Sequence, residues 1–237
     1  VNVQENIGIF SQNTIDWSLA DIASLQLRAV TVPLYATSGV EQAAYILNDA
    51  NIRILFVGDQ KQYDIVSELL ALCPQLKHII VFNSDVVLNE NTPSCYLEDL
   101  INQTQFQHDE VLKQRINECS LDDLFTLIYT SGTTGEPKGV MLDYTSLASQ
   151  LYLHDERLSL SDKDVSLCFL PLSHVFERAW SFYVMHTGAV NVYLTDTHAV
   201  REAMSAVKPT VMCAVPRFYE KVYSAIQDKV SQASVFR

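Results

Sequence analysis

Short apolar segments alternate with helical patterns along most of this chain. The predicted strands cover residues 7–10, 30–35, 52–57, 79–82, 124–129, 165–170, 190–194 and 210–214. Helical patterns lie between them, at residues 63–72, 144–157, 175–185, 199–207 and 217–230, after two earlier helices near residues 14 and 38. Because parallel strands need a crossover between them, this order predicts an α/β fold of layered, mostly parallel sheets flanked by helices.

The first two helices carry apolar residues at helical spacing. Asn13 or Thr14 can cap the first helix. We expect its core-facing residues to be Ile15, Leu19, Ile22 and Ala23. The second helix starts at Ser38 and is expected to bury Ala43, Ala44, Ile46 and Leu47. Between them, Pro33 lacks a backbone donor and predicts a strand at a sheet edge or a strand end.

Polar segments divide the chain. Residues 83–107 are expected to form a loop with a short helical piece at 97–101, and residues 109–117 a solvated helix. Ser159, Ser161, Asp162 and Asp164 cluster between a predicted helix and strand. We therefore expect a boundary there, with one α/β subdomain over residues 1–157 and the start of a second over 158–237.

Charge and cysteine content exclude several classes of protein. The chain has 28 acidic and 16 basic residues and no Lys/Arg cluster, so nucleic-acid binding is not expected. Five scattered cysteines without a Cys-x-x-Cys pair fit a reducing compartment rather than a disulfide framework or a zinc site. The apolar run at residues 179–194 is interrupted by polar residues and is too short for a transmembrane segment. No signal peptide is visible, so we expect a cytoplasmic protein.

Three of the chain's seven glycines, Gly132, Gly135 and Gly139, lie within eight residues, directly after the predicted strand 124–129. Glycines allow backbone N–H groups to approach an anion. The same segment holds four hydroxyls and one cation: Thr130, Ser131, Thr133, Thr134 and Lys138. It could therefore cradle phosphates, although a plain glycine-rich turn is an equal alternative on composition alone. Its spacing fits neither the Gly-x-x-x-x-Gly-Lys-Ser/Thr loop nor the Gly-x-Gly-x-x-Gly fingerprint.

Residues 129–140 resemble the phosphate-binding signature of the adenylate-forming enzymes, Tyr-Thr-Ser-Gly-Thr-Thr-Gly-x-Pro-Lys-Gly-Val, at every defined position. Four further segments are similar to the long-chain fatty acyl-CoA synthetase branch: residues 32–38, 42–49, 169–178 and 215–223. Residues 143–146 depart from the usual family pattern. The resemblance implies that the fold is part of the family's large N-terminal domain.

The resemblance also implies an activity: ATP-dependent conversion of a long-chain fatty acid into an acyl-adenylate and then into acyl-CoA. ATP, Mg²⁺ and coenzyme A are the implied cofactor and co-substrates, and fatty acid and CoA the partners. The implied phosphate-binding residues are Thr130, Ser131, Gly132, Thr133, Thr134, Gly135 and Lys138. Thr130 is also the implied Mg²⁺-side hydroxyl, and His174 would line the acyl pocket.

The chain has neither an initiator Met nor the family's adenine, ribose and C-terminal-domain motifs, so we expect an inactive N-terminal fragment with the C-terminal domain absent. Two alternatives stay open: an acyl-AMP ligase that loads a carrier protein, and a nucleotide-binding or purely structural unit without catalysis. Peripheral membrane association and homo-oligomerisation also stay open.

Other polar residues receive structural interpretations. Glu177 and Arg178 are expected to pair with each other on a helix surface. Asp122 and Asp123 are expected in a solvated loop. Trp180, Phe182 and Tyr183 are interpreted as core or tunnel wall. Arg217 and Lys221 are interpreted as a solvated face, and Arg217, which follows Pro216 at a helix start, could instead support a substrate site.

Overall fold

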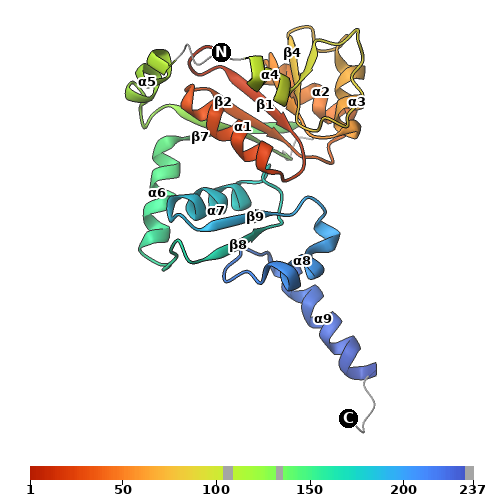
Figure 1. The fold of residues 1–237 in the computed structure, drawn as a ribbon, viewed down its shortest axis with the longest axis vertical. Coiled ribbons are helices and arrows are strands. Elements are labelled where there is room, and N and C mark those ends of the chain that lie inside the picture. Colours follow the sequence, from red (N-terminus) through yellow and green to blue (C-terminus); the bar gives the residue numbers. More distant parts are fainter. Residues whose placement is uncertain (104–108, 132–135, 233–237) are drawn as a thin grey trace.

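The strands form two sheets in the computed structural model, which describes residues 1–103, 109–131 and 136–232 (Figure 1). The larger sheet has the order β5-β4-β3-β1-β2-β6-β7, and all its neighbours are parallel except the antiparallel pair β6–β7. Its strands are β1 (Asn6–Phe10), β2 (Val30–Leu34), β3 (Ile54–Val57), β4 (His78–Val81), β5 (Ser94–Tyr96), β6 (Leu124–Ser131) and β7 (Pro137–Asp143). The smaller sheet pairs β8 (Val165–Cys168) with β9 (Val190–Tyr193) in parallel. The expected α/β class is confirmed.

Nine α-helices are described, several with the capping chemistry that starts a helix. Their bounds are α1 (Ile15–Gln26), α2 (Val40–Asp49), α3 (Gln60–Leu69), α4 (Leu97–Gln103), α5 (Asp109–Asn117), α6 (Tyr144–Asp155), α7 (Val175–His186), α8 (Val200–Val207) and α9 (Pro216–Gln232). Thr14 caps α1 by accepting the N–H of Trp17, and Asp59 forms a capping box with Gln62 at α3. A short 3₁₀ helix, Thr197–Ala199, precedes α8.

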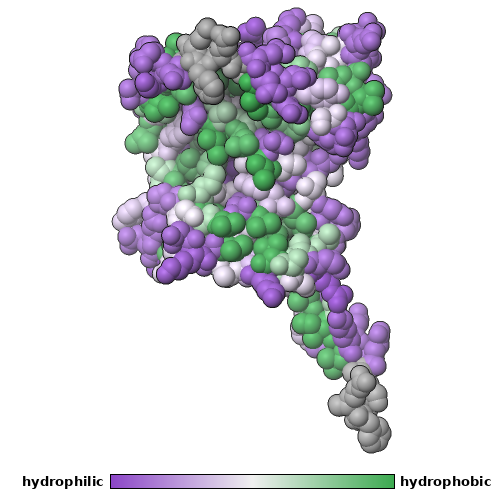
Figure 2. All heavy atoms as spheres, in the orientation of Figure 1, coloured by the Kyte–Doolittle hydropathy of each residue, from purple (hydrophilic) through white to green (hydrophobic). Residues whose placement is uncertain are grey.

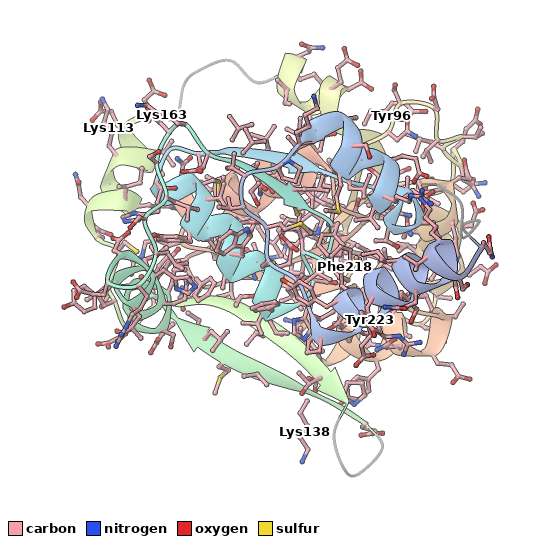
Figure 3. All side chains as sticks on the ribbon, turned by 90° about the horizontal axis from the view of Figure 1, so that it is seen from below. Tyr96, Lys113, Lys138, Lys163, Phe218 and Tyr223 are labelled. Carbon is pink, nitrogen blue, oxygen red and sulfur yellow. The ribbon has the colours of Figure 1, made fainter. Side chains whose placement is uncertain are left out.

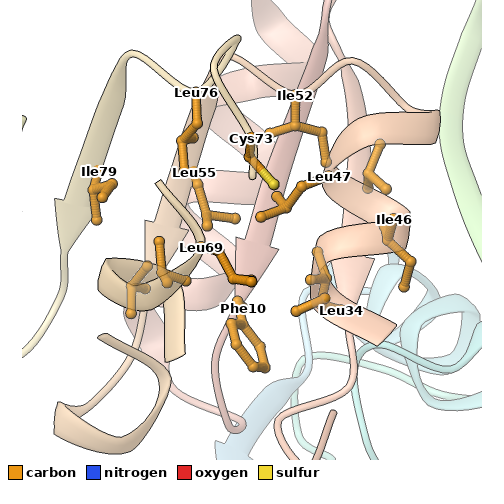
Figure 4. Close-up of a cluster of buried hydrophobic side chains, with 14 of the residues drawn as sticks. Phe10, Leu34, Ile46, Leu47, Ile52, Leu55, Leu69, Cys73, Leu76 and Ile79 are labelled. Carbon is orange, nitrogen blue, oxygen red and sulfur yellow. The ribbon is translucent and has the colours of Figure 1, made fainter. Parts of the chain in front are cut away.

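The main core lies between the larger sheet and helices α2 and α3 (Figure 4). Phe10, Leu34 and Leu55 face it from three neighbouring strands, and Ile46, Leu47 and Leu69 from the two helices. The predicted burial of Ala43, Ile46 and Leu47 on α2 is confirmed, whereas Ala44 is only half-buried.

The expected core face of α1 is wrong. Ile15 and Leu19 are 64% and 56% exposed, and the buried residues of this helix are Trp17, Ser18, Ala20, Asp21 and Ser24. The physical reason is that α1 turns the carboxylate of Asp21 inward, where a buried cation requires it.

Three further expectations are corrected. β5 has no apolar run and was expected as loop, yet it pairs with β4. The predicted strand at 210–214 is reduced to one bridge, Ser166 with Val211. Pro33 lies in an interior strand, between β1 and β6, so the edge alternative is wrong, whereas the strand-end alternative fits its position one residue before the end of β2. It is tolerated there because β6 pairs with β2 at Thr31 opposite Thr126, before Pro33 is reached.

Arg178 of α7 is buried and does not pair with its neighbour Glu177. Its guanidinium donates to both carboxylate oxygens of Asp21, at 2.6 and 2.9 Å, and to the hydroxyls of Thr31 and Thr126. Three aromatic rings surround it, from Trp17, Phe125 and Phe182, with centroids 5.4–5.6 Å from the guanidinium carbon. The expected surface ion pair is therefore wrong, and Arg178 instead connects α7 to α1 and to two strands of the larger sheet.

Asn13 makes a second connection between the two sheets. Its side-chain amide donates to the carbonyl of Leu170 at 2.7 Å and accepts the N–H of Leu172 at 3.0 Å. The hydroxyl of Thr195 donates to the Asn13 carbonyl at 3.0 Å. The loop after β1 thus fixes the segments that follow β8 and β9.

Asp123 is not solvated as expected. It is half-buried, accepts two hydrogen bonds from Arg28 at 2.9 and 3.2 Å, and accepts the N–H of Ser120. These interactions lower the pKa of Asp123, although desolvation opposes them. The pair fixes the entry into β6 against the turn after α1.

Residues 158–232 expose several apolar side chains (Figure 2). Val190, the first residue of β9, is 52% exposed, and α9 projects from the body (Figure 1) with exposed Tyr219, Tyr223 and Ile226. None of the helices in the described ranges is long and apolar enough to cross a membrane.

We predict that Arg178→Leu lowers the free energy of unfolding by about 3–5 kcal/mol, because it leaves the Asp21 carboxylate buried and unpaired. Urea denaturation measures the change. The control, Lys113→Ala, removes an exposed ion pair with Glu110 and is expected to change stability by about 0.5 kcal/mol or less. Equal effects of the two variants would contradict a central role for Arg178.

Candidate functional site

The phosphate-loop motif lies at the end of the β6–β7 hairpin. Thr130 pairs opposite Lys138 and Ser131 opposite Pro137. The strand predicted at residues 124–129 is therefore longer than expected, because the antiparallel ladder continues to Ser131 and Pro137. Gly132, Thr133, Thr134 and Gly135 lie outside the described residues.

Thr130 and Lys138 lie on the same face of the hairpin, because directly opposed residues share a face. Both are exposed, and the Lys138 side chain points away from the body at the hairpin end (Figure 3). The Thr130 hydroxyl and the exposed Lys138 ammonium, side by side, can both donate hydrogen bonds to an anion such as a phosphate.

The same hairpin face becomes apolar toward its base. Ile128 precedes Thr130 by two residues and Leu142 follows Lys138 by four, so the strand period of two puts them on this face. They line a pocket of about 200 Å³ between the hairpin, α6 and α7. Its other lining residues are Phe125, Ser146, Leu147, Gln150, Val175, Arg178, Ala179 and Phe182. Sequence reasoning missed this pocket, because its lining comes from elements that are far apart in the chain, from Phe125 to Phe182.

The opposite face of the hairpin is attached to the core through Tyr129. The Tyr129 ring is 5% exposed and covers Gly139, its partner across the ladder. A Cβ atom on Gly139 would lie 3.1 Å from the ring carbon Cζ, so the glycine leaves room for the tyrosine. Gly139 therefore has a packing role in the motif.

His174 lies at the N-terminus of α7, where Nδ1 of its ring accepts the N–H of Phe176 at 3.2 Å. The residue is exposed. In the described part of the chain it has no hydrogen bond to the hairpin. Its neighbour Val175 lines the apolar pocket, so the α7 N-terminus lies at the edge of that pocket.

Glu177 is a buried carboxyl close to this helix N-terminus. Its Oε2 accepts the N–H of Leu170 at 3.0 Å and lies 3.3 Å from the thiol sulfur of Cys213. Burial raises the pKa of Glu177 to about 7, and hydrogen bonds from Cys213 and Leu170 partly oppose the shift. Burial also raises the pKa of the Cys213 and Cys168 thiols, which keeps them neutral. Glu177 thus holds the β8–α7 connection that leads to His174.

The fold and the hairpin define an α/β domain with a mostly parallel sheet and a protruding antiparallel hairpin. The model of the AMP-binding enzyme family matches residues 1–235, and the chain belongs to that family. It is 30% identical over 97% of its length to long chain acyl-CoA synthetase 2 of Arabidopsis thaliana, covering 36% of that protein. It is 31% identical over 98% of its length to the long-chain-fatty-acid–CoA ligase FadD15 of Mycobacterium bovis, covering 38% of that protein. The chain thus spans less than half of the length of these relatives.

Solved structures agree in fold. The N-terminal domain of FACL13 from Mycobacterium tuberculosis has a TM-score of 0.75 at 18% identity, over all of this chain and 54% of that one. A putative long-chain-fatty-acid CoA ligase from Rhodopseudomonas palustris has a TM-score of 0.74 at 24% identity, over 91% of this chain and 51% of that one. These likenesses show the α/β fold of the N-terminal domain.

We predict that the free energy of unfolding of the wild type falls, relative to that of the Glu177→Gln variant, as the pH rises from 5 to 8. The folded-state pKa is about 7 against the ordinary 4.5, so the folded state binds more protons between these values and loses stability as the carboxyl ionises. The variant lacks this ionisation, and its advantage should grow by about 2–3 kcal/mol over the range. Urea denaturation at each pH measures it, with Glu68→Gln as an exposed control. A difference independent of pH would contradict the raised pKa.

Proposed function

We propose that this chain forms part of an AMP-forming long-chain fatty acid–CoA ligase. The observation that carries the proposal is the hairpin face on which Thr130 and Lys138 lead into an apolar pocket. Such a face suits a molecule that joins phosphates to an acyl chain. Membership of the AMP-binding family and the names of the relatives support the same activity.

The chemistry proposed for the whole protein has two steps. The fatty-acid carboxylate attacks the α-phosphorus of ATP, which forms an acyl-adenylate and releases pyrophosphate. The thiolate of CoA then attacks the acyl carbon, forms the thioester and releases AMP. The first step requires a highly anionic triphosphate to be held in line, so positioning and charge stabilisation are the main tasks of the protein.

In this proposal the hairpin binds the β- and γ-phosphates through Thr130, Ser131, Lys138 and the intervening residues Gly132, Thr133, Thr134 and Gly135. The Mg²⁺ that this reaction class uses shields the phosphate charge. The Thr130 hydroxyl fits as one oxygen ligand of a metal held mainly by phosphates and water. In the described parts of the chain, no three His, Cys, Asp or Glu side chains gather to hold a metal by themselves.

The apolar pocket beside the hairpin is the proposed entrance for the acyl chain, with His174 near its edge. Its volume of about 200 Å³ is below the range of about 300–1,000 Å³ typical of ligand pockets. The pocket would therefore hold the part of the acyl chain nearest the carboxylate. The length of the fatty acid would be determined elsewhere in the protein.

A second candidate is an acyl-AMP ligase that transfers the acyl group to a carrier protein. Both candidates share the adenylation step, so the hairpin suits either. The relatives named as CoA ligases favour the first. Thioester formation by the whole protein on CoA against a carrier protein separates them.

We predict that Lys138→Ala weakens binding of magnesium pyrophosphate to the chain by roughly 10–150-fold, the value of one charge-assisted hydrogen bond of about 1.5–3 kcal/mol. Isothermal titration calorimetry measures the affinity. Stability should change by about 0.5 kcal/mol or less, since Lys138 is exposed. The matched control is Lys163→Ala, an exposed lysine before β8 that should leave the affinity unchanged. Equal affinities of wild type and Lys138→Ala would remove Lys138 from the site.

We further predict that the 237-residue chain alone does not catalyse palmitate-dependent exchange of pyrophosphate into ATP. It covers only 36–38% of the relatives' length, and reactant positioning contributes roughly 7–11 kcal/mol to such rates. Radiolabelled exchange by the purified chain tests this, with a full-length relative as the positive control. Exchange above the background of a mock purification would show that these residues suffice.

A further inference from the structure

We propose that Tyr129 and Asp49 are a positioning pair that fixes the phosphate-binding end of the β6–β7 hairpin. The inference rests on the proposed function, because it assigns that end of the hairpin to phosphate. It concerns two residues that do not touch the phosphates themselves.

The direct observation is one hydrogen bond. The Tyr129 hydroxyl donates to Oδ2 of Asp49 at 2.5 Å, and Asp49 is the last residue of α2. Tyr129 directly precedes Thr130, and neighbouring strand residues point to opposite faces. The Tyr129 side chain therefore holds the core side of the hairpin while Thr130 and Lys138 occupy the other side.

The hairpin end has few other attachments. β6 pairs with β2 at Thr126, five residues before its own end, and continues paired only with β7. For residues 129–130 and 136–139, the Tyr129–Asp49 bond is the only side-chain hydrogen bond to the body that the described structure contains. The direction in which the hairpin leaves the sheet thus depends on where this ring is held.

The ring is held on three sides. Tyr45, one turn before Asp49 on α2, meets it edge to face at a centroid distance of 6.4 Å. Gly139 lies beneath it and has no side chain to displace it. Burial and the Asp49 carboxylate both raise the pKa of Tyr129, so the phenol keeps the proton that it donates.

The location of Asp49 supports a specific role. An acidic side chain in the last turn of a helix is repelled by the negative end of the helix dipole, and Asp is a weak helix former. Asp49 therefore contributes little to α2 on its own. The phenol of Tyr129 supplies the proton that stabilises the carboxylate at that position.

The test compares four variants by calorimetric titration with magnesium pyrophosphate and by thermal denaturation: two single variants, their double variant and Asp49→Asn. Tyr129→Phe retains the ring and removes the bond, and Asp49→Ala removes the acceptor. Each should weaken pyrophosphate binding by about three- to tenfold, and the double variant should be no weaker than either single one. Asp49→Asn keeps an oxygen acceptor and should restore most of the affinity.

Tyr63→Phe is the matched control for loss of a buried hydroxyl. Tyr63 belongs to the same core, and its hydroxyl bonds to Thr92 and Ser94, away from the hairpin. This variant should lower the melting temperature by a similar amount to Tyr129→Phe without changing the pyrophosphate affinity.

Three results would overturn the inference. Unchanged affinity in Tyr129→Phe and Asp49→Ala, while Lys138→Ala still weakens binding, would reject the positioning pair and leave the proposed function standing. A loss of affinity in Tyr63→Phe equal to that in Tyr129→Phe would show a general effect of stability. If the wild-type chain and Lys138→Ala both fail to bind pyrophosphate, the proposed function fails and the positioning pair fails with it.

Discussion

The buried guanidinium of Arg178 is the constraint on which the arrangement of the two sheets depends. An arginine cannot be neutralised by losing its proton, so its burial requires acceptors on several sides. Those acceptors come from Asp21 on α1, Thr31 on β2 and Thr126 on β6. The single cation of Arg178 therefore connects α7 to one helix and two strands, α1, β2 and β6.

This tie also defines the candidate site. Thr126 lies at the base of the β6–β7 hairpin, and α7 supplies Ala179 and Phe182 to the apolar pocket. The two walls of the pocket are thus held by the same guanidinium. Asn13 and Glu177 then fix the segment after β8, which brings His174 to the pocket edge.

The order of elements and the phosphate-loop motif could be predicted from the sequence because both are local. Caps such as Thr14, and the strand-then-glycine pattern after residue 129, involve residues within a few positions of each other. The buried face of α1 could not be predicted from the sequence, because Arg178, the partner of Asp21, lies 157 residues away. Ile15 and Leu19 dominated the apolar pattern, while the actual inner face includes a carboxylate. Glu177 and Arg178 were misassigned as a pair because adjacent helix residues point in different directions.

The site itself was predictable in composition but not in geometry. The sequence placed Thr130 and Lys138 together in one loop, and only the register of the hairpin shows that they oppose each other across two strands. Because neighbouring strand residues point to opposite faces, that register also places the proposed binding residues on one face and the residues that attach the hairpin to the core on the other. Ile128, Thr130 and Lys138 lie on the face that leads to the pocket, where we propose that acyl and phosphate groups bind, while Tyr129 and Gly139 hold the hairpin against the core. A substitution on the pocket-side face, such as Lys138→Ala, can therefore weaken binding while the attachment of the hairpin through Tyr129 stays intact.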